Sequence, residues 1–233
     1  MLVLALDTTT RHGSVALGGD FGPPVVRPLP PGEPVATRLP AELGRLLADA
    51  GRRLDEVDAL AVATGPGSFT GLRIGIATMQ GLAFALGRPV IGVSGLDALA
   101  ALARTPGVNR VATWVDAWRG EVYGSEYGED AAGSEPTVDQ PASLLARMPR
   151  GEDWTFIGDG AVAYAAAITA ASPGFRLADP ATPLLAGAVG ALALTRLAAG
   201  DPGAGSAIRP LYVRRPDAEL ARSAARGLEG SRP

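Results

Sequence analysis

The chain has no cysteine, no lysine and a single histidine, His12, among its 233 residues. Without cysteine it can form neither a disulfide nor a thiolate nucleophile, and a zinc site would lack sulfur ligands. The absence of lysine excludes Schiff-base chemistry and the phosphate-binding lysine of a P-loop. One histidine cannot supply a paired-histidine metal site, so the sequence predicts no tightly bound transition metal. A Ser–His–Asp triad would have to use His12, which we interpret as a turn residue.

The sequence also has little net charge and no recognisable targeting segment. Its formal net charge of −3 gives no electrostatic case for binding nucleic acid over a wide surface. The first ten residues lack the basic segment of a signal peptide, and no uncharged apolar run reaches 18 residues. We therefore expect a soluble cytoplasmic protein that does not contact membranes.

Hydrophobic residues make up 47% of the chain, and residues 64–86 are the stretch around which the rest is organised. A short apolar run before this stretch predicts a strand that is covered on both faces. Gly65-Pro66-Gly67 then predicts a tight turn, because proline fixes φ and glycine adopts conformations closed to other residues. The helix that follows has only three polar side chains between Gly71 and Leu86, so it should be covered on most sides.

Small residues recur along this helix at spacings of three and four: Gly71, Gly75, Thr78, Gly81 and Ala85. Glycine inside a helix costs about 1 kcal/mol relative to alanine, so we expect this ridge to pack closely against a neighbour or a partner. Two interpretations of the turn and helix stay open. One is an anion-binding loop, where free N–H groups meet the helix dipole. The other is a plain strand–turn–helix joint that Ser68 or Thr70 caps.

The predicted order in the first half of the chain is βββαβαβα, and the second half looks like a looser copy of it. In the first copy we expect strands at 2–6, 14–17, 25–29, 59–63 and 90–93, with helices at 40–50, 70–86 and 96–103. In the second copy we expect strands at 110–116, 121–127, 136–138 and 154–157, with helices at 143–148, 160–170 and 184–199. A change of composition near residue 105 divides the chain into predicted domains 1–104 and 105–216. Residues 217–233 are polar and lack periodicity, so we expect a disordered tail.

Two βββαβα units are the layout of the actin/Hsp70/sugar-kinase (ASKHA) superfamily. The predicted fold class is therefore α/β, with two ASKHA-like domains made of duplicated units. In that superfamily a nucleotide lies between the domains and is held by strand–turn elements. Here Asp7, Thr8, Thr9 and Asp116 occupy the two turns, and they are the candidate nucleotide or phosphate contacts. Alternatively, both aspartates simply cap turns.

Three segments, LALDTTTRHGSVAL, GPGSFTGLRIG and VDAWRGEVYGSEY, resemble the bacterial TsaB family, also called YeaZ. The resemblance covers most of residues 1–128, and it implies a role in making N6-threonylcarbamoyladenosine beside the anticodon of tRNA. In that pathway TsaD transfers the threonylcarbamoyl group, TsaB binds TsaD without catalytic equipment of its own, and TsaE is a P-loop ATPase that joins them. The resemblance thus implies that the chain has no catalytic residue and no tightly bound cofactor. It also implies that ATP or ADP with Mg²⁺ binds only in the complex, and that the chain meets tRNA through that complex.

We expect the partner surface on the two helices of the first domain, where apolar side chains exceed what one sheet can cover. The candidate interface residues are Leu43, Leu47, Gly71, Leu72, Gly75, Ile76, Thr78 and Met79. The same patch could form a homodimer when TsaD is absent. Alternatively, the glycine ridge packs only inside the domain. The alternative functions are a small-molecule kinase or ATPase of the same superfold, with Asp7 or Asp116 as its base, and, ranked last, a metallopeptidase.

Overall fold

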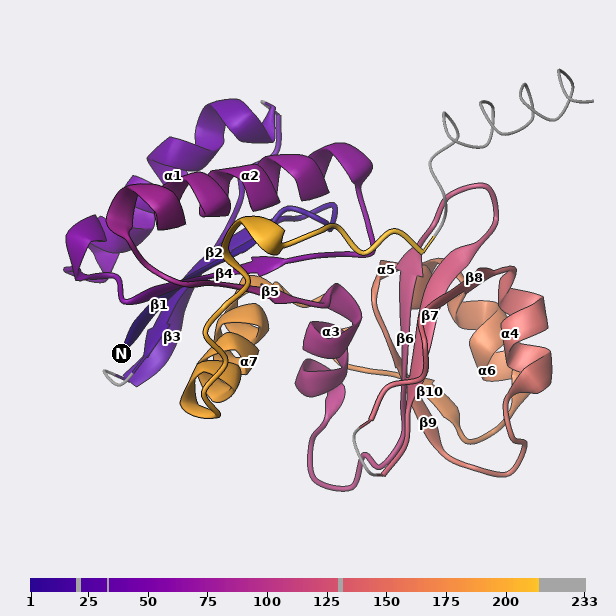
Figure 1. Cartoon of the computed structure of the whole chain (residues 1–233). Helices are drawn as coiled ribbons and strands as arrows, with labels where there is room; N and C mark the ends of the chain where they lie inside the picture. Colours follow the sequence, from indigo (N-terminus) through magenta and orange to yellow (C-terminus); the bar gives the residue numbers. More distant parts are fainter. Residues whose placement is uncertain (20–21, 33, 130–131, 214–233) are drawn as a thin grey trace, which may run out of the picture.

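The computed structural model describes residues 1–19, 22–32, 34–129 and 132–213, which form two five-stranded sheets side by side with helices around them (Figure 1). The first sheet has the order β3-β2-β1-β4-β5, and its strands are β1 (Leu2–Asp7), β2 (Ser14–Gly19), β3 (Gly22–Pro28), β4 (Ala59–Ala63) and β5 (Val90–Val93). The second has the order β10-β9-β6-β7-β8, and its strands are β6 (Val111–Asp116), β7 (Val122–Tyr127), β8 (Thr137–Asp139), β9 (Trp154–Ile157) and β10 (Phe175–Leu177).

Both sheets share one mixed pairing pattern. Strand β1 pairs antiparallel with β2 and parallel with β4, while β6 pairs antiparallel with β7 and parallel with β9. The predicted duplication of a βββαβα unit is therefore confirmed. The sequence does not predict β10, because three residues around Arg176 are too few to show a period. The helix expected at 160–170 is two short helices, α5 (Asp159–Ala163) and α6 (Ala165–Ala171), which meet at Tyr164.

Strand β1 is buried on both faces, and its alternating side chains serve two different cores. Val3 and Ala5 lie in the core under α7 (Ala186–Ala198). Leu4 and Leu6 lie in the core under α1 (Val35–Asp49) and α2 (Phe69–Leu86). A third core forms in the second sheet around the edge-to-face pair of Trp114 and Phe156, against α4 (Pro141–Arg147).

The last helix of each unit packs on the sheet of the other unit, which joins the two halves. Helix α3 (Gly95–Ala103) follows the first sheet in sequence but packs on β6 and β9, whereas α7 follows the second sheet and packs on β1, β2 and β4 (Figure 1). The small residues of α7 allow the helix to lie close to the sheet, since Gly190 lies directly against Ala5. Helix α7 belongs by sequence to the predicted domain 105–216, yet it packs on the first sheet. The boundary near residue 105 itself stays a prediction, and the expected tail at 217–233 lies outside the described residues.

Helix α2 is the most apolar long helix in the described part of the chain. It begins after Ser68, whose Oγ accepts a hydrogen bond from Gly71 N at 3.2 Å, and ends at Gly87, with φ of 63°. By length and composition alone it could cross a membrane, as no other helix of the described residues could. A core helix meets the same test, and the inner face of α2 packs on β4. Only a third of α2 is buried, however, so much of its apolar surface faces outward.

Candidate functional site

The carboxylate of Asp7, at the end of β1, is completely buried and accepts hydrogen bonds from the turn that follows it. Oδ1 accepts hydrogen bonds from Thr9 N at 2.8 Å and from Thr9 Oγ1 at 2.7 Å. Oδ2 accepts one from Thr10 Oγ1 at 2.6 Å. Both oxygens therefore have donors within three residues, which agrees with the turn-capping interpretation of this aspartate.

The turn after β1 lies against the start of α2, and the glycines of that helix make the contact. Thr8 Oγ1 donates to the carbonyl oxygen of Gly71 at 2.7 Å, and Ser68 N donates to the carbonyl oxygen of Thr9 at 2.9 Å. A Cβ at Gly71 would lie 1.9 Å from the Thr8 carbonyl oxygen, and one at Gly75 would lie 2.3 Å from Thr8 Oγ1. Gly71 and Gly75 of the small ridge therefore pack inside the chain, as in a strand–turn–helix joint. The N–H groups of Ser68 and Gly71 already have acceptors, which leaves the anion-binding interpretation without support from these two donors.

Asp116, at the end of β6, also stabilises a turn. Its Oδ1 accepts a hydrogen bond from Trp118 N at 2.9 Å, and its own N–H donates to Asp159 Oδ1 at 2.9 Å. Trp118 and Arg119 have φ of 60° and 58°, so this hairpin tip is left-handed at two non-glycine residues. The aspartate is thus well placed to hold a strained turn in shape.

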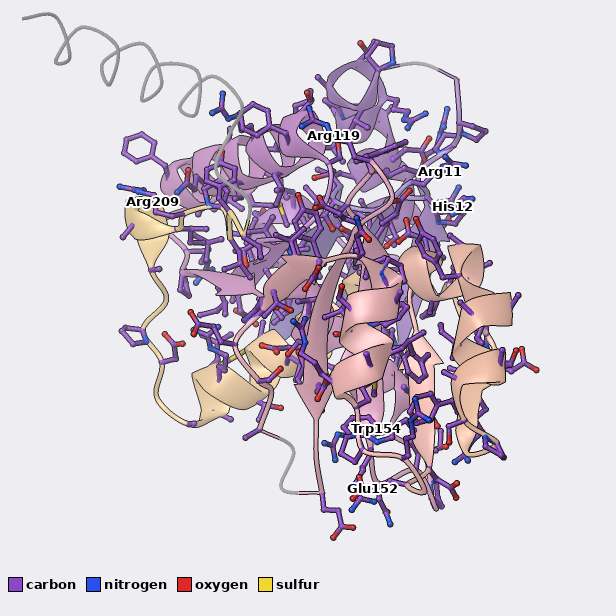
Figure 2. The ribbon with its side chains drawn as sticks, turned by 90° about the vertical axis from the view of Figure 1, so that its right-hand side faces the viewer. Arg11, His12, Arg119, Glu152, Trp154 and Arg209 are labelled. Carbon is purple, nitrogen blue, oxygen red and sulfur yellow. The ribbon has the colours of Figure 1, made fainter. Side chains whose placement is uncertain are left out.

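The two halves do meet at a hollow, but neither Asp7 nor Asp116 lines it. Its walls come from the β1–β2 turn, α3, β6 and the segments around residues 158 and 182, and they include Arg11, His12 and Asp159. The free space is about 20 Å³, enough for roughly one water, whereas pockets for small ligands have about 300–1,000 Å³. Figure 2 shows Arg11 and His12 at the same end of the molecule as Arg119, opposite to Glu152 and Trp154. Within the described ranges, no group of three or more acidic residues and histidines could hold a metal ion.

The structure places the candidate interface residues inside the molecule rather than on its surface. Seven of the eight are buried, namely Leu43, Leu47, Gly71, Leu72, Gly75, Ile76 and Met79. Thr78 is half-buried. The apolar pattern correctly identifies one face of each helix, but that face covers the first sheet. A partner that binds the exposed side of α2 would therefore meet other residues.

The exposed surface of α2 is mostly apolar, and we call it the outer face of α2. It consists of Phe69, Thr70, Arg73, Ala77, Gly81, Phe84 and Ala85. The Phe84 side chain is 92% exposed, the highest value among the exposed large hydrophobic residues of the described chain. Arg73 lies over the Phe69 ring at 3.9 Å and donates from Nε to Tyr212 Oη at 3.2 Å. The sequence indicates an exposed apolar face because α2 has so few polar residues. The spacing of those residues does not show which side of the helix faces outward.

Comparison with known proteins shows which families and solved structures this chain is similar to. The TsaD family model, described as tRNA N6-adenosine threonylcarbamoyltransferase, matches residues 34–222. The chain is 41% identical over 167 residues to the tRNA threonylcarbamoyladenosine biosynthesis protein TsaB of Escherichia coli strain K12, which covers 69% of this chain and 72% of that protein. YeaZ from Pseudomonas aeruginosa, a solved structure, aligns with 91% of this chain and 99% of its own, at 35% identity and a TM-score of 0.75.

A more distant solved structure shows how widely the fold is shared. The activator of the 2-hydroxyisocaproyl-CoA dehydratase from Clostridium difficile, with bound ADPNP, aligns with 86% of this chain and 97% of its own. The TM-score is 0.53 at 9% identity, so this likeness shows the fold alone. Together with the YeaZ match, it confirms the predicted ASKHA-like two-domain fold.

Proposed function

Because the chain belongs to the TsaB (YeaZ) family and has a role in tRNA threonylcarbamoyladenosine biosynthesis, we propose that it acts there as a non-catalytic partner of TsaD. In this role it supports TsaD in the complex that transfers the threonylcarbamoyl group to tRNA. TsaE homologues join the complex, and tRNA is reached through it. The setting is the cytoplasm.

The observation that carries this proposal is the outer face of α2. An apolar helix surface that ends in the almost fully exposed Phe84 is what a protein–protein interface needs, because aromatic anchors dominate binding energy. The TsaD family model extends over both α1 and α2, so TsaD has equivalent helices to set against them. The same face permits a two-fold homodimer when TsaD is absent.

The polar residues of the two turns support an accessory rather than a catalytic role. Asp7 is buried and hydrogen-bonded within its turn, so it cannot act as a base toward a bound substrate in this conformation. In this conformation the hollow between the halves has about 20 Å³ of free space, which is less than a nucleotide needs. We therefore expect no tightly bound cofactor, with ATP or ADP and Mg²⁺ entering only in the complex.

A reconstituted transfer reaction tests the proposal. TsaD and TsaE homologues from the same organism are incubated with tRNA, ATP and threonylcarbamoyl-adenylate, with and without this chain, and modified adenosine is measured by mass spectrometry. We expect modification to depend on adding the chain, no product from the chain alone, and full support from an Asp116→Asn variant, whose amide oxygen still accepts from Trp118 N. Steady ATP turnover or phosphorylation of small hydroxylated substrates by the pure chain, lost in Asp116→Asn, would replace this proposal with the kinase alternative.

A further inference from the structure

The turn that joins β6 to β7 presents a tryptophan to solvent, and we call residues 117–120 the hairpin tip (Figure 1). The Trp118 side chain is 64% exposed, and among the large hydrophobic side chains of the described chain only Phe84 is more exposed. The other two tryptophans, Trp114 and Trp154, are buried in the core of the second sheet. Packing in that core therefore does not explain the tryptophan at the tip.

The backbone of the hairpin tip holds Trp118 and Arg119 in a conformation that residues with side chains rarely adopt. Their φ angles are 60° and 58°, in the left-handed region. Trp118 N donates a hydrogen bond to Asp116 Oδ1 at 2.9 Å. Ala117 N donates to the carbonyl oxygen of Glu121 at 3.0 Å, and Glu121 N donates to that of Trp118 at 3.1 Å. The indole therefore stands on a fixed backbone, which lowers the conformational entropy that binding costs.

The charges around the hairpin tip favour an anionic partner. Arg11 and Arg119 are exposed and lie at the same end of the molecule (Figure 2). The acidic residues nearest the tip, Asp116, Glu121 and Asp159, are only half-buried or less exposed than these arginines. Asp159 Oδ1 accepts hydrogen bonds from two backbone N–H groups, both at 2.9 Å, and Asp116 Oδ1 holds the tip. The guanidinium groups are thus the charges that a partner meets first.

We propose that the hairpin tip binds one unpaired nucleobase in a loop of tRNA, an inference that rests on the proposed function. The Trp118 indole stacks on the base, and Arg119 pairs with a neighbouring phosphate. Proteins recognise bases in RNA mostly in single-stranded loops, where aromatic rings stack on them, because side chains cannot read the deep groove of an RNA helix. One aromatic ring with an arginine beside it suits such a base and not a duplex. This contact is separate from the outer face of α2, and it gives the chain a direct part in holding tRNA.

Fluorescence polarisation with two labelled RNA probes and the full chain tests the site. One probe is a hairpin with the sequence of a tRNA anticodon arm, and the other is a blunt duplex of the same stem, which has no unpaired base. We expect the hairpin to bind at least about fivefold more tightly than the duplex, as one stacked base provides. The hairpin should also quench the intrinsic fluorescence of the chain through Trp118, because the other two tryptophans are buried.

Variants at the tip separate recognition from folding. Trp118→Ala should weaken hairpin binding by about fivefold or more, whereas Trp118→Phe, which keeps an aromatic ring, should retain most of the affinity. Trp118→Asn should weaken binding as alanine does while melting at an equal or higher temperature, because asparagine tolerates a left-handed backbone. Arg119→Gln should weaken binding and reduce its dependence on salt by about one phosphate contact. Arg88→Gln, on the exposed residue after α2, should bind as the unmodified chain does.

The proposal is wrong if the hairpin does not bind, if hairpin and duplex bind equally, or if Trp118→Ala leaves hairpin affinity unchanged. Normal RNA binding by Trp118→Ala with weaker binding of the TsaD or TsaE homologue would assign the tip to a protein contact instead. These results leave the proposed function standing, because that function depends on whether the chain is needed in the reconstituted transfer reaction. In that reaction Trp118→Ala should raise the KM for tRNA with little change in kcat.

Discussion

Tyr127 joins the two halves of the molecule through one partly buried hydrogen bond. Its hydroxyl, on β7, donates to Asp97 Oδ1, on α3, at 2.7 Å. Burial raises the pKa of Tyr127 well above its usual value, and the neighbouring Asp97 carboxylate raises it further. The folded chain therefore holds this phenol neutral at pH values where the unfolded chain would ionise it.

The sign of the resulting pH dependence follows from that shift. A group whose pKa is raised by folding stabilises the native state fully below its unfolded pKa, about 10 for tyrosine, and less as the pH rises above it. We expect the free energy of unfolding, measured with urea, to fall more steeply between about pH 9 and 11 for the unmodified chain than for Tyr127→Phe. At neutral pH the variant should be less stable by about 1 kcal/mol, through the lost hydrogen bond. Parallel pH profiles for the two proteins would show that Tyr127 does not contribute in this way.

Helix α2 has two kinds of glycine, although the sequence shows them as one ridge. Gly71 and Gly75 are buried against the turn after β1, where a Cβ would collide with Thr8. Gly81 is exposed, with no atom within 4 Å of the position its Cβ would take. Close backbone contact requires glycine at the first two positions, and nothing in the described structure requires it at the third.

Alanine substitutions should therefore have opposite effects along the same helix. Gly71→Ala should destabilise the chain by about 2 kcal/mol or more, because its methyl group would overlap the Thr8 carbonyl oxygen. Gly81→Ala, the matched control, should stabilise it by up to about 1 kcal/mol through helix propensity. Urea denaturation midpoints give both values. If Gly71→Ala is as stable as Gly81→Ala, the turn after β1 does not contact α2 as described.

The sequence predicts the helices and strands of this fold better than it predicts the contacts between them. The apolar run of β1 and the turn at 65–67 predict their strand and joint from local chemistry alone. Whether Gly71 meets a partner or Thr8 depends on a residue 63 positions away, and a helical period does not identify that neighbour. The unpartnered hydroxyl of Thr155 gives no sequence signal, since an identical threonine at 113 is satisfied by the opposite strand.

Exchange of the last helices makes the two halves depend on each other. Helix α7 comes from the end of the described chain, yet Val189 and Ala193 lie in the same core as Val3, Ala5 and Ala61 of the first sheet. Without α7, that face of the sheet would be open to water. The first half is therefore not expected to be stable as an isolated unit.

A fragment of residues 1–104 tests this dependence. We expect it to lack a cooperative thermal transition by circular dichroism, because removing α7 exposes an apolar sheet face. A chain truncated after residue 217 is the matched control, and the composition of its missing segment predicts an unchanged melting temperature. A cooperative transition in the fragment near that of the whole chain would show that α7 is dispensable for the first sheet.

Association with TsaD through the outer face of α2 is the central claim, and calorimetric titration with the TsaD homologue of the same organism tests it most directly. Three proteins are compared: the unmodified chain, Phe84→Glu on the outer face of α2, and Val162→Glu on α5. Both residues are exposed, so neither substitution should lower the melting temperature by more than a degree or two. We predict that Phe84→Glu weakens TsaD binding by more than about tenfold, because it puts a charge in an apolar contact, and that Val162→Glu binds normally. Equal binding by all three proteins, or no binding by the unmodified chain, would contradict the account.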